Sequence, residues 1–206
     1  MPFPSLTPAC PEPALPWTGR NPVSPGWFEM RSARVPRDAR PVYDEDMDCV
    51  IGYYRRFASV ASTYDLTGGV VTLDACTDED GGTRAPLLVA GALWQPRVHG
   101  VTRLGSEGEG LAAPATTLAW LRGRFIALAR QPLHFSPTAL ADMYEPERFV
   151  PLHILRLTIR CGAPPAADTA RFIAQITRRG IPTALELTLR PRDHTVLCLR
   201  TWPVAG

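Results

Sequence analysis

Short apolar runs separated by polar or proline-containing breaks recur along this chain, and most of them have the two-residue period of β-strands. Residues 49–54 (CVIGYY) and 69–73 (GVVTL) are rich in β-branched and aromatic side chains, so we expect a strand at each. Residues 86–94 (PLLVAGALW) follow an acidic turn at 74–82 and predict a further strand. The pattern favours a mainly β protein.

The second half of the chain shows the clearest alternation. Residues 152–161 (LHILRLTIRC) place apolar side chains on one face and arginine or threonine on the other, which predicts a strand. Residues 185–189 and 196–202 repeat this pattern on either side of the turn residues 190–194 (RPRDH), which predicts a hairpin.

Two segments fit more than one element. Residues 118–129 (LAWLRGRFIALA) fit a strand or a short helix, with Gly123 weakening the helix. In residues 166–179 the apolar positions alternate as in a strand, yet the preceding prolines, Asp168 and Gly180 are typical of helix ends. These end signals favour a helix at 166–179 and therefore leave an α+β fold as the alternative.

Proline divides the chain into two regions. Residues 1–41 hold ten of the 22 prolines, which favours an extended N-terminal arm that is either mobile or partner-binding. Trp17, Trp27 and Phe28 are the residues that could dock this arm onto a folded body. We expect residues 42–206 to form a single β-rich domain with a flexible loop at 102–116.

Composition narrows the classes of function. The chain is 45% hydrophobic and 20% charged, which suits a packed core, and its net charge of +2 argues against nucleic acid as a partner. All 22 basic residues are arginine, which fits GC-rich coding or the escape of a viral regulator from lysine modification. Neither a zinc spacing nor a signal peptide nor a membrane-spanning apolar run is recognisable. We expect a cytoplasmic or nuclear protein that is not secreted.

Four motifs follow one another between residues 61 and 176: STYDL at 62–66, GRFIALAR at 123–130, ADMYEPERFVPLHILRL at 141–157 and RFIAQI at 171–176. In this order they resemble the motifs of the dUTPase family, trimeric β-barrel enzymes that hydrolyse dUTP. The middle two are also similar to the dUTPase-like early protein of some adenoviruses, which keeps the fold without the activity. The resemblance implies a dUTPase-like β-barrel or sandwich with few short helices.

The resemblance also implies roles for five residues. Asp142 would be the base that activates water, and Tyr144 would pack on the deoxyribose. Asp65 would lie near the water shell of Mg²⁺, and Arg130 and Gln175 would contact phosphates. Without the resemblance, each of these residues also has an ordinary interpretation. Asp65 fits a turn acid and Asp142 fits a solvated acid of a loop or helix. Arg124 and Arg130 fit surface charges whose stems cover apolar neighbours.

Departures from the family pattern favour a vestigial site. Gln131 and Pro132 stand where the family presents small residues to the phosphates, and one residue instead of two separates Asp142 from Tyr144. The last residues read TWPVAG, where the family has a Gly-rich lid over the nucleotide.

The resulting hypothesis is a non-catalytic viral regulatory protein on a dUTPase-like scaffold, without a cofactor or metal, that binds a host protein or a second copy of itself. The first alternative is an active dUTP pyrophosphatase that uses Mg²⁺. The second follows from the helix interpretation of residues 166–179 and is similar to an adenoviral early protein that self-assembles and sequesters host factors.

Overall fold

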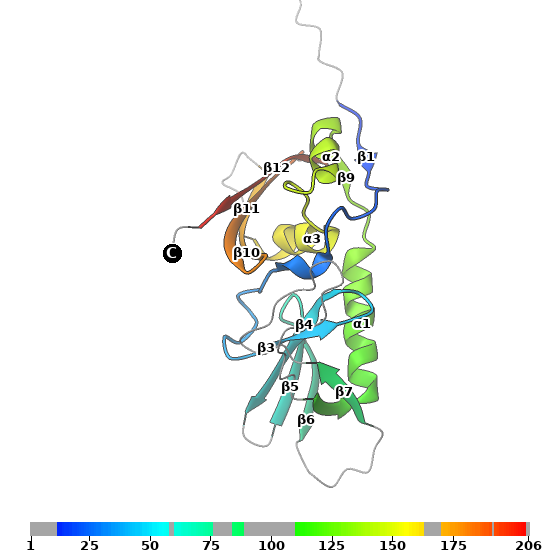
Figure 1. Ribbon diagram of the computed structural model, residues 1–206, viewed down its shortest axis with the longest axis vertical. Helices are drawn as coiled ribbons and strands as arrows, with labels where there is room; N and C mark the ends of the chain where they lie inside the picture. Colours follow the sequence, from blue (N-terminus) through cyan, green and yellow to red (C-terminus); the bar gives the residue numbers. More distant parts are fainter. Residues whose placement is uncertain are drawn as a thin grey trace, which may run out of the picture.

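The computed structural model describes residues 12–57, 60–75, 84–88, 110–162, 170–190 and 192–204. Two layers, each built on a β-sheet, lie one above the other, and helix α1 runs along the lower layer and reaches α3 of the upper layer at one end (Figure 1). In chain order the elements are β1 (Leu15–Pro16), the 3₁₀ turn η1 (Pro25–Trp27), β2 (Phe28–Glu29), β3 (Arg40–Asp44), β4 (Cys49–Phe57), β5 (Val60–Asp65), β6 (Val70–Ala75), β7 (Arg84–Leu88), β8 (Gly110–Pro114), α1 (Ala115–Ala129), β9 (His134–Phe135), α2 (Pro137–Tyr144), α3 (Leu152–Cys161), β10 (Arg171–Arg178), β11 (Ile181–Leu189) and β12 (Val196–Pro203).

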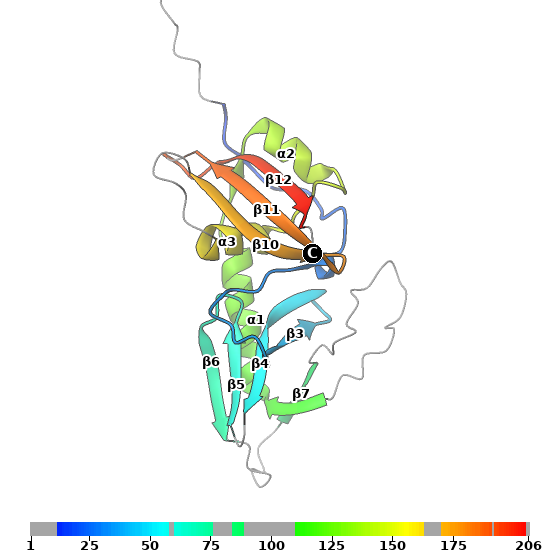
Figure 2. The same cartoon turned by 90° about the vertical axis from the view of Figure 1, so that its left-hand side faces the viewer.

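The large sheet has six strands in the order β1-β9-β12-β11-β10-β2, antiparallel except for the parallel β12–β9 pair. Its three long strands are the meander β10–β12, and the hairpin predicted from residues 185–202 is confirmed as β11 and β12. Helices α2 and α3 pack on the inner face of this meander. The outer face is turned toward the viewer in Figure 2.

The small sheet has four antiparallel strands in the order β3-β4-β5-β6. The strands predicted at residues 49–54 and 69–73 are confirmed as β4 and β6. Helix α1 resolves the ambiguity of residues 118–129, and it packs on β4 and β5. Strands β7 and β8 form a separate two-stranded ribbon.

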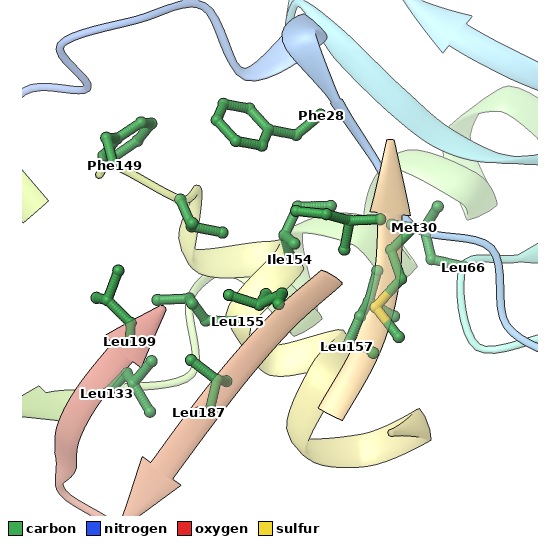
Figure 3. Close-up of a cluster of buried hydrophobic side chains, with 14 of the residues drawn as sticks. Phe28, Met30, Leu66, Leu133, Phe149, Ile154, Leu155, Leu157, Leu187 and Leu199 are labelled. Carbon is green, nitrogen blue, oxygen red and sulfur yellow. The ribbon is translucent and has the colours of Figure 1, made fainter. Parts of the chain in front are cut away.

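The main hydrophobic core lies between the large sheet and α3 (Figure 3). Leu155 and Leu157 of α3, Leu187 of β11 and Phe149 are all fully or almost fully buried. Phe28 crosses the ring of Phe149 edge-on, with 6.1 Å between ring centroids. Burial of aliphatic and aromatic side chains on this scale is what holds the upper layer together.

The predicted strand at residues 152–161 is wrong, because this segment is helix α3. The alternating pattern was misleading at Thr158, because the strand prediction places this residue on a polar face whereas it is completely buried. Its hydroxyl donates to the Ile154 carbonyl at 3.0 Å, one helical turn earlier, which satisfies a polar group inside the core. With Thr158 counted as a core residue, the buried positions follow the helical period.

The predicted helix at residues 166–179 is also wrong over Arg171–Arg178, which form strand β10. The α+β alternative built on that helix falls with it. Ala174 and Ile176 point into the core while Ile173 and Gln175 are exposed, so the alternation was the informative signal. Pairing with β11 along all eight residues outweighs the helix-end signals of the flanking proline and glycine.

Residues 12–41 contain the docking contacts that the sequence suggested. Trp27 and Phe28 are buried, and Trp17 contacts Tyr144 of α2 with 4.7 Å between ring centroids. Met30 and Val35 add to the same core.

Two further expectations fall partly outside the described residues. Strand β7 covers residues 86–88 of the strand expected at 86–94, and residues 89–94 lie outside the described part. Of the loop expected at 102–116, residues 102–109 lie outside the described part, Gly110–Pro114 form β8, and α1 begins at Ala115. The protein is thus mainly β, and its described strands form open sheets that do not close into a barrel.

Candidate functional site

A surface hollow of about 140 Å³ lies where the β5–β6 turn meets helices α1 and α3. Asp65 and Thr67 of the turn form one side, Arg124 of α1 and Arg160 of α3 contribute cationic groups, and Gln131 follows α1. The turn belongs to residues 61–69 (ASTYDLTGG), which contain the STYDL motif. This hollow is therefore the candidate functional site.

Asp65 holds its own turn together. Its Oδ1 accepts hydrogen bonds from the Thr67 amide at 2.9 Å, the Thr67 hydroxyl at 2.7 Å and the Gly69 amide at 2.9 Å. The Asp65 amide donates to the Gly69 carbonyl at 2.8 Å, and Gly68 adopts a φ of 86°, which favours glycine. This is the geometry of a turn acid that closes a hairpin.

The cationic side of the hollow is built from two packed helices. Arg124 lies on an exposed face of α1, and Arg160 lies in the last turn of α3, where a positive charge interacts favourably with the helix dipole. Helices α1 and α3 contact each other, which brings both arginines to the lining of one hollow. Neither arginine takes part in an ion pair with a residue that the structure describes.

A buried polar cluster lies behind the hollow, next to Phe125. The His153 ring is 5.1 Å from the Phe125 ring, and burial lowers the pKa of His153 to about 4, so the imidazole is neutral at pH 7. Burial raises the pKa of Glu29, whose Oε1 accepts from the Tyr53 hydroxyl at 3.2 Å. Tyr53 also donates to the Met30 carbonyl at 3.1 Å, so this cluster fastens β2 to β4.

The two residues expected to do catalysis lie on α2, in the upper layer. Asp142 accepts from Nη1 of Arg148 at 2.5 Å, an ion pair within one local segment. Tyr144 is about half exposed and contacts Trp17. In Figure 1, α2 and strand β5 with Asp65 belong to opposite layers of the molecule.

The remaining two predicted residues lie elsewhere. Arg130 is exposed directly after α1, and Gln175 is exposed on the outer face of β10. Among the described hydrogen bonds, ion pairs and ring contacts, none joins any two of Asp65, Arg130, Asp142, Tyr144 and Gln175.

The donor set does not fit a magnesium site. One carboxylate oxygen of Asp65 accepts from three donors of its own turn, and Asp142, which lies on α2 in the other layer, is paired with Arg148. Within the described ranges, no group of three or more His, Cys, Asp or Glu side chains is arranged to hold a metal ion.

Sequence reasoning missed Arg160 and Gln131 as neighbours of Asp65. Arg160 was placed on a strand, and only the helix brings it toward α1. It also missed the buried carboxylate of Asp44, which accepts from Nε of Arg122 at 2.5 Å across the small sheet and α1. These residues are 78 positions apart, so no local pattern signals the pair.

Comparison of the chain with family models, curated proteins and solved structures gives no match. No helix in the described part of the chain combines the length and apolarity needed to cross a membrane.

Proposed function

We propose that the chain is a non-catalytic viral interaction protein, built on a dUTPase-like scaffold, that binds a host protein in the cytoplasm or nucleus. The observation that carries the proposal is the use of the two carboxylates that the resemblance assigns to chemistry. Asp65 and Asp142 are each engaged in bonds to nearby residues, in different layers of the fold.

A hydrolase requires these groups to converge on one substrate. A general base must lie within about 3 Å of the water whose proton it takes, and that water must face the phosphate. Asp142 instead pairs with Arg148, and Asp65 closes a hairpin. This separation supports a protein that does not carry out the reaction.

The outer face of the large sheet supports an interaction role. Ile173 of β10, Trp202 of β12 and Val204 are 40%, 41% and 40% exposed. Trp202 is opposite Ala184, and the Val204 amide donates to the Pro182 carbonyl, so Trp202 and Val204 lie at one end of the face, whereas Ile173 is opposite Glu186, further along the sheet. Exposed apolar side chains gathered on one face are typical of protein contacts.

Calorimetric titration with dUTP in the presence of Mg²⁺ tests the loss of the reaction. We expect neither heat of binding nor release of pyrophosphate. Tight binding of dUTP, or pyrophosphate release that the Asp142→Asn variant abolishes, would establish the nucleotide hydrolase instead.

Differential capture from extracts of candidate host cells tests the interaction. We expect proteins captured by the wild-type chain to be lost with Trp202→Ala and retained with Trp120→Ala, a matched exposed tryptophan on α1. Equal capture by all three proteins would remove the outer face from the proposal. The self-assembly alternative rested on a helix at 166–179, where the structure has strand β10.

A further inference from the structure

We propose that the hollow beside Asp65 is a socket for one anionic group, a carboxylate or a phosphate, on a side chain of the partner polypeptide. The inference rests on the proposed interaction function and adds the chemistry that the partner presents. Its basis is the convergence of Arg124 and Arg160 on a small, partly apolar opening.

Charge is the first argument. Two arginines and one aspartate are the charged residues that line the hollow, so its local charge is positive. The carboxylate of Asp65 forms no described ion pair with either arginine, and its Oδ1 already accepts from three donors of its own turn. Two like charges at one hollow repel each other, and an anion bound between them would be attracted by both.

Hydrogen-bonding chemistry is the second argument. Each guanidinium offers five N–H donors in a planar fork that matches a carboxylate or a phosphate. Gln131 adds an amide at the same opening. Donors therefore outnumber free acceptors, and a ligand with several acceptor oxygens is the one that satisfies them.

The volume of the hollow is the third argument, because it distinguishes a single side chain from a nucleotide as the ligand. The hollow measures about 140 Å³, whereas sites for drug-sized ligands are roughly 300 to 1,000 Å³. A nucleoside triphosphate does not fit this space, but the end of one acidic side chain does. Phe125 and Leu128 of α1 also line the hollow and supply an apolar wall for the aliphatic stem of that side chain.

Nuclear magnetic resonance of the arginine Nε–Hε groups tests the socket in the full-length chain. The probes are glutarate for a carboxylate on an apolar stem, inorganic phosphate for a phosphoryl group, and glutaramide as the uncharged control. We expect the Arg124 and Arg160 signals to shift with glutarate or phosphate and to stay unchanged with glutaramide. The anion with the lower Kd identifies the source of the charge.

Variants give the matched comparison. Arg124→Gln and Arg160→Gln should each raise the Kd of the preferred anion about tenfold, which corresponds to about 1.4 kcal/mol, because each removes a charged hydrogen-bond donor. Arg200→Gln, an exposed arginine on β12 away from the hollow, should leave the Kd unchanged. Unchanged thermal melting of the three variants shows that each remains folded.

The outcomes are separable from those of the proposed function. An unchanged Kd in both hollow variants, or an equal loss in Arg200→Gln, would overturn the socket, even if dUTP fails to bind. Binding of dUTP that survives both hollow substitutions would overturn the non-catalytic function and leave the socket standing.

Discussion

The two layers of this protein are stabilised in different ways. In the upper layer, the large sheet and α3 enclose an extensive core of aliphatic and aromatic side chains. In the lower layer, the small sheet and α1 enclose a smaller cluster that includes Val42, Ile51 and Leu121. Both layers bury side chains with hydroxyl groups, but the buried carboxylates of Asp44 and Asp65 belong to the lower layer.

The lower layer therefore depends more on the contacts of buried carboxylates. Asp44 is fully buried at its carboxylate and accepts from Arg122, whose guanidinium also reaches Asp46 at 2.7 Å. Oδ1 of Asp44 accepts from the amides of Asp46 and Met47 as well, so one carboxylate fixes the β3–β4 turn and the position of α1. Such contacts tolerate substitution poorly, because loss of one partner leaves the other unsatisfied.

Truncation of a core leucine in each layer gives the largest expected effect. Leu155→Ala in α3 should lower the free energy of unfolding by about 4 kcal/mol, and Leu121→Ala in α1 by about 2–3 kcal/mol, because fewer apolar neighbours surround Leu121. Urea unfolding followed by circular dichroism measures both. An equal or larger loss for Leu121→Ala would show that the lower cluster is as important as the upper core.

Protonation of His153 at acid pH should lower the free energy of unfolding, because this side chain is buried between the two layers with Phe28, Met30 and Tyr53. Its pKa of about 4 lies below the ordinary 6.5, so the unfolded chain binds the proton first as the pH falls. Stability is unaffected above pH 6.5 and decreases by about 3 kcal/mol on acidification to pH 4.

The His153→Leu variant isolates this effect, because other titrating groups remain. The difference in urea midpoint between the variant and the wild type should grow, in favour of the variant, from pH 6.5 to pH 4. A difference that is constant across this range would mean that His153 becomes protonated within the folded protein at its ordinary pKa.

Two ion pairs, one in each layer, compare buried and exposed carboxylates. Asp44→Ala should cost about 2–3 kcal/mol, less than a fully buried pair because Arg122 retains 37% side-chain exposure. Asp142→Ala should cost less than about 1 kcal/mol, because its partner Arg148 is 66% exposed. Thermal melts in low and high salt measure both. Equal losses would contradict the dependence of the lower layer on polar contacts.

The turn at Asp65 separates the contribution of the negative charge from that of the acceptor geometry. Asp65→Asn keeps an oxygen acceptor for the three turn donors and should cost less than about 1 kcal/mol, whereas Asp65→Ala should cost about 1–2 kcal/mol. Chemical denaturation of the two variants checks the order. A larger loss for Asp65→Asn would show that the negative charge, rather than the acceptor geometry, stabilises the turn.

Local signals were sufficient where a segment's environment is uniform along its length. The β-branched run in β6 and the alternation around the β11–β12 turn predicted their strands correctly. They failed at α3 and β10, which exchanged their expected structures. In α3 a buried threonine resembled a surface residue, and in β10 pairing with β11 prevailed over flanking helix-end signals.

The candidate site was only partly accessible to sequence reasoning. Asp65 was found because a turn motif is local, and its alternative as a turn acid agrees with its hydrogen bonds. Arg160 was hidden, because its approach to Arg124 depends on α3 being a helix that packs against α1.

The mainly β character, the central hairpin of the large sheet and the turn at Asp65 follow from local sequence signals, because these features depend on the two-residue period and on contacts between near neighbours. Long-range packing selects which apolar segment is helix and which is strand, places α1 between the small sheet and α3, and brings Arg124 and Arg160 to one hollow. Each of these depends on partners distant in the chain, and the free energy of burial against those partners exceeds the weak local preferences of a few residues.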